Sequence, residues 1–170
     1  MIPTIDGDAP TDMFDSILVV TNGTDPGSRP AERAVALAET HDAELHALYV
    51  VDVAKDWDMA VERREAEGEA AVEFVANRGA ERDVPVVKHF RYGRTHEEIV
   101  DYAAAHEVDL VVVPSTTRRG LSRMLAPTDL AERVIGRTDV PVLGIDVADA
   151  TEHGSAEEAG DGANAPTVAD

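Results

Sequence analysis

The chain has 170 residues and a formal net charge of −19, from 34 acidic and 15 basic residues. This length fits one domain with flanking segments; it excludes a TIM barrel and disfavours two full-sized domains. The sequence contains no cysteine, which excludes a disulfide framework, a thiolate zinc site and a cysteine nucleophile.

The charge also bears on partners and cellular location. A strongly negative chain disfavours binding to nucleic acid or to an anionic membrane, and only Lys55 and Lys88 of its basic residues are lysine. An acidic surface poor in lysine suits a salt-rich cytosol, because hydrated carboxylates keep a protein soluble when long-range repulsion is screened. The acidic amino terminus has no secretory h-region, and the apolar runs are too short to cross a bilayer. These features predict a cytoplasmic protein of halophile type.

The two ends of the chain differ in composition from the centre. Residues 1–13 and 148–170 carry acidic side chains and no basic ones, and the second segment has one Val and no Leu, Ile or aromatic residue. Such segments cannot bury enough apolar surface to offset the entropy of ordering. We expect a disordered extension over 1–13, one domain over 14–147, and an acidic disordered tail over 148–170. The tail is interpreted as a solvating extension, with a partner-binding segment as the alternative.

Within the centre, short apolar runs alternate with helical periodicity. In chain order, the patterns predict a strand over 16–21, a helix from Pro30, a strand over 44–51, a helix over about 58–80, a strand over 85–91, a helix from Thr95, a strand over 109–113, a helix from about Thr128 and a strand over 140–146. Thr95 with Glu98 matches a capping box.

The helices are expected to bury one apolar face each. The expected buried residues are Ala31, Ala34, Val35 and Ala38 in the first helix, Ala66, Ala70, Phe74 and Val75 in the second, Ile99, Val100 and Ala103 in the third, and Leu130, Ala131, Val134 and Ile135 in the fourth. Strands with little polar alternation predict an α/β fold: an open, doubly wound parallel sheet of five strands with helices on both faces.

Ligands of such sheets bind at the carboxyl ends of the strands, where the strand order reverses. The loop over 114–127 carries several hydroxyls and three arginines, and two more arginines follow the third predicted strand. Arginine and hydroxyl groups suit phosphate or carboxylate oxygens, and a helix N-terminus near Thr128 adds N–H donors. The pattern predicts an anion or nucleotide pocket; the alternative is that the arginines pair with surface acids. The arginines are Arg91, Arg94, Arg118, Arg119 and Arg123.

The sequence shows no motif for ordinary catalysis. It lacks a Walker A loop, a Gly-rich dinucleotide fingerprint and a G-x-S-x-G elbow, and its six histidines include no i, i+4 pair. His46 and His89 fall in predicted strands and are interpreted as core or edge residues rather than ligands. Arg91 stands where a receiver domain would have its phosphoacceptor Asp. We therefore predict no catalytic residue and no metal ligand, and an enzymatic function is not supported.

Several blocks of the sequence together resemble the universal stress protein (UspA) family. The blocks FDSILVVTNGT, ELHALYVVD, YGRTHEEIVDYAAAHEVDLVVV, RGLSRML and AERVIGRTDVPVLGI run from Phe14 to Asp146. The resemblance implies an open α/β sheet of order 3-2-1-4-5, similar to that of the adenine nucleotide alpha hydrolases, and a function in the stress response. It also implies a homodimer through the fifth strand, whose unpaired edge gives a reason for pairing. The interface candidates are Val140, Val142, Leu143 and Ile145.

The ATP-binding pattern of that family is degraded in this sequence. ATP-binding members resemble G-x-x-G-x9-G-[ST] after the fourth strand, and the three glycine positions correspond to Pro114, Thr117 and either Thr128 or Pro127. Glycine lets backbone N–H groups approach phosphate closely, whereas proline has no N–H and threonine resists positive φ. Asn22 replaces the Asp that usually ends the first strand of ATP binders.

Other residues are candidates for a nucleotide site or for a looser anion site. One is Val51, which matches the position whose backbone contacts adenine in ATP-binding members of the family. The full set is Thr21, Asn22, Val51, Ser115, Thr116, Thr117, Arg118, Arg119 and Thr128. We predict a dimeric stress-response or regulatory module without tight ATP binding and with no certain cofactor. A nucleotide-binding switch or slow ATPase that uses the substituted loop is the alternative, and a small-anion binder is the third. ATP or another nucleotide is disfavoured as a ligand but left open.

Overall fold

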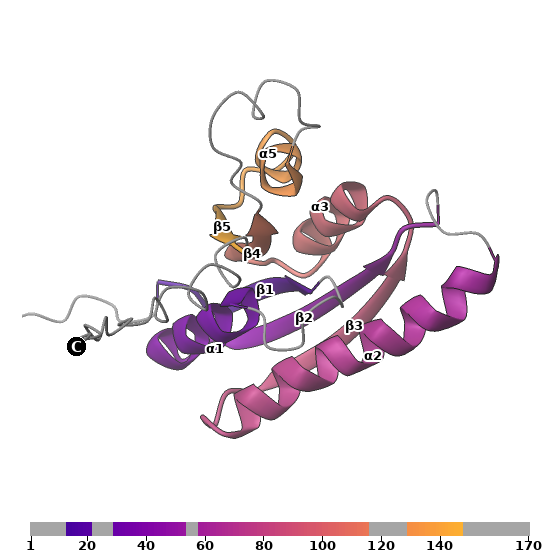
Figure 1. The fold of residues 1–170 in the computed structure, drawn as a ribbon. Coiled ribbons are helices and arrows are strands. Elements are labelled where there is room, and N and C mark those ends of the chain that lie inside the picture. Colours follow the sequence, from indigo (N-terminus) through magenta and orange to yellow (C-terminus); the bar gives the residue numbers. More distant parts are fainter. Residues whose placement is uncertain (1–12, 22–28, 54–57, 116–128, 148–170) are drawn as a thin grey trace, which may run out of the picture.

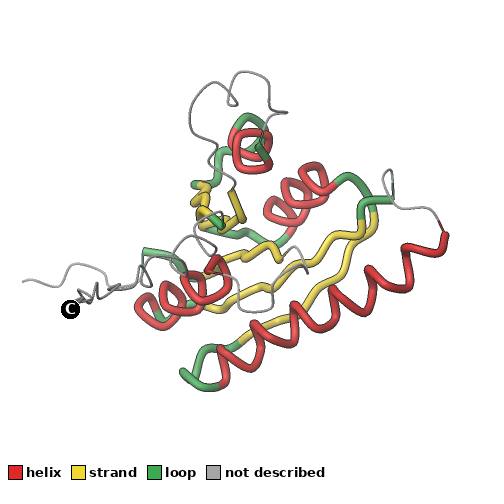
Figure 2. The backbone as a smooth tube through the Cα atoms, in the orientation of Figure 1, coloured by secondary structure: helices red, strands yellow, loops and turns green. Residues whose placement is uncertain are grey.

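The computed structural model describes residues 13–21, 29–53, 58–115 and 129–147, in which strands and helices alternate as expected (Figures 1 and 2). The elements are β1 (Ser16–Thr21), α1 (Arg29–His41), β2 (Glu44–Val51), α2 (Asp58–Ala80), β3 (Val86–Tyr92), α3 (Thr95–Ala105), β4 (Leu110–Ser115), α5 (Leu130–Ile135) and β5 (Val142–Asp146). The expected disordered ends lie outside the described residues, apart from Met13.

The five strands form one parallel sheet in the order β3-β2-β1-β4-β5. β1 lies at the centre, where Ile17 pairs with Leu45 of β2 on one side and with Leu110 of β4 on the other. The expected fold class and strand order are therefore confirmed. The strand order reverses between β1 and β4, and ligands of such sheets bind at the carboxyl ends of the strands on either side of this reversal.

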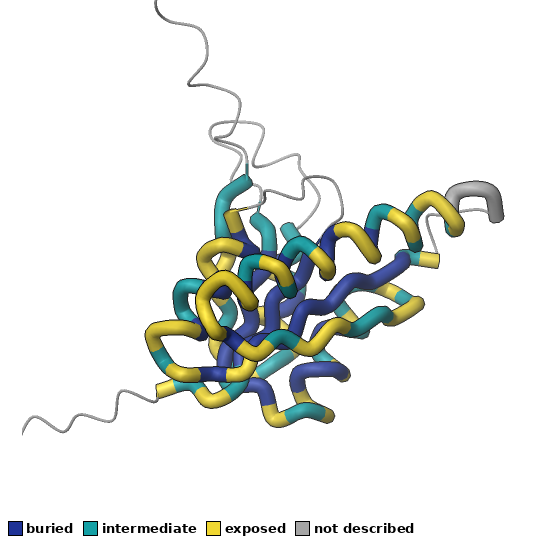
Figure 3. Tube along the Cα trace, turned by 90° about the horizontal axis from the view of Figure 1, so that it is seen from below, coloured by how far each residue is buried: buried dark blue, intermediate teal, exposed yellow. Residues whose placement is uncertain are grey.

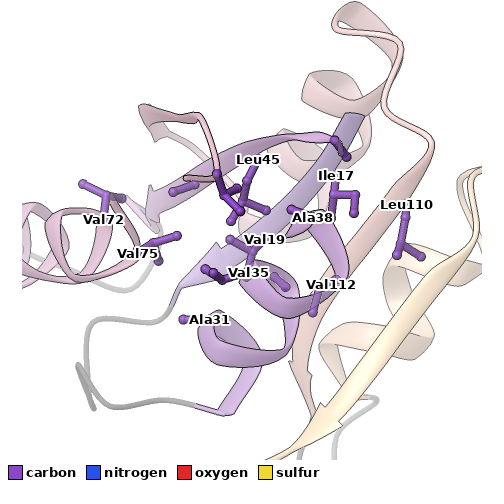
Figure 4. Packing of buried hydrophobic residues seen from close by; sticks show 14 of the residues in the cluster. Ile17, Val19, Ala31, Val35, Ala38, Leu45, Val72, Val75, Leu110 and Val112 are labelled. Carbon is purple, nitrogen blue, oxygen red and sulfur yellow. The ribbon is translucent and has the colours of Figure 1, made fainter. Parts of the chain in front are cut away.

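Each face of the sheet carries its own apolar core, because successive strand residues point to opposite faces. Ile17 and Val19 belong to the core under α1 and α2, whereas Leu18 and Val20 belong to the core under α3 and α5. Figure 1 shows the two helix pairs on opposite sides of the sheet, and Figure 4 shows the first core from close by. Figure 3 shows the buried residues along the strands and the exposed residues on the outer sides of the helices.

Helix α2 packs through a different face from the one expected. Among the residues expected to be buried, only Val75 is buried; Phe74 is half-buried, and Ala66 and Ala70 are exposed. A Cβ at Gly68 would overlap the ring of Tyr49, so the absent side chain is what lets α2 approach β2. The observed buried positions are Gly68, Ala71, Val72, Val75 and Gly79.

The predicted capping box at Thr95 is also wrong. Arg94 is the N-cap residue of α3, with extended backbone and no side-chain cap, and its carbonyl accepts from the N–H of Glu98 at 3.0 Å. Gly93 precedes it with a φ of +156°, a conformation that L side chains rarely adopt. The helix therefore begins at Thr95, one residue earlier than the capping box predicts.

The remaining corrections concern element ends. α5 begins at Leu130 rather than near Thr128, because Asp129 caps it, and Ile135 at its end is 56% exposed rather than buried. Leu130 and Val100, both expected to be buried, are half-buried. No helix within the described part of the chain is long and apolar enough to cross a membrane.

Candidate functional site at the carboxyl edge of the sheet

Thr21 and Val51 end neighbouring strands at the edge where a ligand was expected. Both are largely buried, at 8% and 1% exposed. The Thr21 hydroxyl donates to the carbonyl oxygen of Leu48 at 3.4 Å, and the Val51 carbonyl accepts from the N–H of Gly93 at 3.0 Å. The hydroxyl of Thr21 and the carbonyl of Val51 therefore already have partners within the chain, and the Val51 carbonyl anchors the turn that leads into α3.

Ser115 ends β4 and makes the most informative contact at this edge. Its Oγ donates a short hydrogen bond to Oδ2 of Asp129, while Oδ1 of Asp129 accepts from the N–H of Leu130 at 2.8 Å. Asp129 thus joins the end of β4 to the start of α5. A carboxylate at a helix start satisfies a free N–H and interacts favourably with the helix dipole. The sequence analysis missed Asp129, although it lies one or two residues after the third glycine position, which falls at Thr128 or Pro127.

The other predicted ligand-site residues lie outside the described residues. They are Asn22, Thr116, Thr117, Arg118, Arg119 and Thr128. Their roles stay predictions.

Two arginines of the predicted cluster can be placed. Arg94 forms an exposed ion pair with Glu97 at 3.3 Å, as the alternative interpretation of the arginines expected. The guanidinium of Arg91 lies 5.7 Å from the ring centre of Tyr102 in α3, within the range of a cation–π contact. Both described arginines therefore have partners within the fold.

A surface groove of about 620 Å³ lies along α1 and β5, at a place that the sequence analysis did not consider. Three arginines contribute to its lining, and among the described residues Arg29 and Arg33 form no ion pair with a carboxylate. Arg82 pairs with Glu39 at 3.0 Å. The lining residues are Arg29, Glu32, Arg33, Ala36, Arg82, Gly144, Ile145 and Asp146. No sequence motif marks this groove, because its lining combines α1, Arg82 and β5, which are distant from one another in the chain.

β5 is an edge strand, hydrogen-bonded to β4 alone within the described sheet. Of the predicted interface residues, Leu143 is 37% exposed. Val140 and Val142 are half-buried against the core under α3 and α5, and Ile145 is half-buried against the opposite core. The strand therefore has one unpaired edge and apolar side chains on both faces.

Known proteins of similar sequence identify the family of this chain. Residues 13–145 match the universal stress protein family. This chain belongs to that family. A universal stress protein of Methanocaldococcus jannaschii is 32% identical over 139 residues, covering 77% of this chain and 81% of that protein. The family match covers most of the chain and includes all nine described elements up to Ile145 of β5.

Solved structures of universal stress proteins have the same architecture. A family member from Burkholderia pseudomallei is 25% identical with a TM-score of 0.62, covering 80% of this chain and 98% of that one. A universal stress protein solved in complex with cAMP is 19% identical, also with a TM-score of 0.62, covering 78% of this chain and 97% of that one. At that identity the second likeness supports the fold alone.

Proposed function

We propose that this universal stress protein is a dimeric, non-enzymatic regulatory module that does not bind ATP tightly. The observation that carries the proposal is the contact between Ser115 and Asp129. In the ATP-binding pattern, a Ser or Thr follows the third glycine. With that glycine position at Thr128 the hydroxyl residue is replaced by Asp129, and with it at Pro127 the hydroxyl residue is Thr128 and Asp129 comes next. In either alignment a carboxylate stands at the hydroxyl position or directly after it.

The carboxylate of Asp129 opposes phosphate binding in two ways. It occupies the Ser115 hydroxyl and the Leu130 N–H, both groups that donate hydrogen bonds to anions. It also adds a negative charge beside any phosphate that approaches this edge, and like charges a few ångströms apart repel strongly in partly buried sites. Pro114, in β4 itself, has no N–H to offer.

The experiment is isothermal titration calorimetry with ATP in molar KCl, on the wild type and on Asp129→Ser. The wild type is expected to show no affinity in the micromolar range, and Asp129→Ser is expected to bind about tenfold more tightly than the wild type, a gain of about 1.4 kcal/mol. Asp139→Ser, at an exposed aspartate after α5, is the matched control and should leave the affinity unchanged. Micromolar ATP affinity of the wild type, or ATP retained through purification, would overturn the proposal.

A nucleotide-binding switch or slow ATPase is the second candidate. Its precedent is a universal stress protein of the same fold that was solved in complex with cAMP. If this candidate is correct, the wild type binds a nucleotide in the same titration, and mass spectrometry of the freshly purified protein finds the nucleotide bound.

The arginine-lined groove beside β5 favours the third candidate, a small-anion binder. Its affinity for phosphate should fall in an Arg29→Ala/Arg33→Ala double variant.

Dimerisation through β5 is proposed from its unpaired edge and its exposed Leu143. The chain offers a matched control: Leu143 on β5 and Val87 on β3 are both 37% exposed, and they lie on opposite edge strands of one sheet. Light scattering after gel filtration should give a dimer for the wild type and for Val87→Glu, and a monomer for Leu143→Glu. A monomeric wild type, or a dimer that persists in Leu143→Glu, contradicts the β5 interface.

A further inference from the structure

Three histidines gather where β2, β3 and the carboxyl-terminal half of α3 meet. We call His46, His89, His106 and Tyr102 the imidazole cluster. The ring centroids of His46 and His89 are 5.6 Å apart, those of His46 and His106 are 6.0 Å apart, and those of His89 and His106 are 5.7 Å apart. Histidines from β2, from β3 and from the C-cap of α3 thus form a close triangle, which no spacing in the sequence marks.

His46 is bonded on both sides of its ring. Its Nδ1 lies 2.7 Å from the hydroxyl of Tyr102, and its Nε2 lies 3.0 Å from a carboxylate oxygen of Glu44. A neutral imidazole carries one donor and one acceptor. Since a carboxylate only accepts, Nε2–H donates to Glu44 and Nδ1 accepts from the Tyr102 hydroxyl. With His46 at 7% exposed and Tyr102 at 1% exposed, this assignment satisfies both buried groups in the neutral state.

The ring nitrogens of His89 have fewer hydrogen-bond partners than those of His46. Its Nε2 is buried and has no hydrogen-bond partner within the described part of the protein. The neighbouring residue on the same face of β3 is Arg91, a fixed positive charge. A proton on His89 would therefore stand near Arg91 and the other two histidines, with only Glu44 to compensate.

His106 completes the contact from the helix side. Its ring stacks on that of Tyr102, with centroids 3.9 Å apart and planes 12° from parallel, and its Nδ1 lies 3.0 Å from the carbonyl oxygen of Tyr102. The titratable and charged groups around the cluster are Glu44 and His46 on β2, His89 and Arg91 on β3, and Tyr102 in α3 with its C-cap residue His106. One carboxylate thus faces three imidazoles and a guanidinium.

We propose that the imidazole cluster is an acid-sensitive contact: uncharged, it holds the carboxyl-terminal half of α3 against β2 and β3, and protonation releases that half-helix. Among the described residues, no three His, Asp or Glu side chains are arranged to hold a metal ion. Release would expose the buried face of α3, including Tyr102, to solvent or to a partner.

The sign of the pH response follows from burial. Burial lowers the pKa of His46, with His106 adding to the effect and Glu44 opposing it. Burial also lowers the pKa of His89, helped by the positive charge on its neighbours. The released state has ordinary histidine pKa values near 6.5 and so binds more protons than the closed state. The contact is at full strength above about pH 6.5 and weakens as the pH falls below it, by up to about tenfold per pH unit for each of His46 and His89.

Burial raises the pKa of Tyr102 to about 12. This phenol therefore stays protonated throughout the range in which the histidines titrate. It remains a hydrogen-bond donor to His46 and does not itself respond to acid.

Hydrogen exchange of the full chain, followed by mass spectrometry and corrected for the intrinsic pH dependence, tests the proposal. Between about pH 7.5 and about pH 5.5, protection of residues 102–105 should fall at least about tenfold relative to α1 and α2. In His89→Phe, which keeps a ring but cannot titrate, the fall should be several-fold smaller. His96→Gln, in the first turn of the same helix, should behave as the wild type.

His89→Gln provides a second non-titrating variant in case the phenylalanine disturbs the packing. Equal loss of protection in α1, α2 and α3 would indicate global unfolding and overturn the proposal. So would an unchanged protection of α3 in the wild type, or a pH response in both His89 variants that matches the wild type.

Discussion

The two faces of the sheet are covered by two helices each, yet they are held in different ways. The face under α1 and α2 is packed by apolar side chains, Tyr49 among them, and by glycines that bring helix and strand close together, as at Gly68. The face under α3 and α5 also has an apolar centre, but it buries the imidazole of His46 against Tyr102. The strength of an apolar contact depends little on pH, whereas the charge of a buried imidazole changes as the pH falls. One sheet therefore joins a face that is insensitive to acid to one that responds to it.

The largest expected effect comes from filling the close approach on the first face. Gly68→Val places a branched side chain against the ring of Tyr49, where even a Cβ has no room. We expect the free energy of unfolding to fall by about 3 kcal/mol, the upper range for overpacking a core. Urea unfolding followed by circular dichroism measures it.

The matched control is Ala70→Val, two residues further along α2 at an exposed position. It introduces the same β-branched residue into the same helix and should cost about 0.5 kcal/mol through helix propensity alone. Equal costs for the two variants would mean that Gly68 does not set the distance between α2 and β2.

This glycine also shows where sequence reasoning stopped. The apolar stripe of α1 was predicted correctly, because Ala31, Ala34 and Val35 recur at helical spacing and carry the buried surface themselves. In α2 the contact face includes glycines, which a search for apolar side chains passes over. The sequence therefore predicted the helix and its limits but chose Ala66 and Ala70, which are exposed.

The candidate site was predicted only in part, because some of its contacts depend on the fold and not on a local pattern. Ser115 was a candidate because it follows an apolar strand at the expected edge. Asp129 was missed, since its role depends on how the chain returns to β4 after the loop, which no local pattern specifies. The imidazole cluster depends on strand register and on the position of α3, so the sequence shows Tyr102 and His106 as helix neighbours but not their meeting with His46.

A smaller effect is expected on the second face from Tyr102→Phe. The substitution removes the hydroxyl that donates to Nδ1 of His46 and leaves that buried nitrogen without a donor. We expect a loss of about 1–2 kcal/mol in the free energy of unfolding at neutral pH, the cost of an unpaired buried polar group. Chemical denaturation at about pH 7.5 measures the loss while the histidines are neutral.

Tyr92→Phe is the matched control for this hydroxyl. Tyr92 is 52% exposed, and its hydroxyl donates to Glu65 at 2.8 Å in contact with solvent, so water can replace the lost partner. Its removal should change the free energy of unfolding by less than about 0.5 kcal/mol. If Tyr102→Phe were equally mild, the hydrogen bond to His46 would not contribute to holding α3.

The smallest effect is expected from the ion pair that joins β3 to α2. Lys88 Nζ lies 2.6 Å from Oε2 of Glu73, with both side chains about half exposed. Exposed pairs of this kind contribute little, so Lys88→Gln should cost less than about 0.5 kcal/mol, and less still in molar KCl because the salt screens the charges. A double-mutant cycle with Glu73→Gln at low and high salt isolates the pair. A coupling above about 1 kcal/mol that survives molar KCl would mean that charge, and not only packing, holds α2 on its face. The two faces would then differ in the kind of polar contact they use rather than in whether they use one.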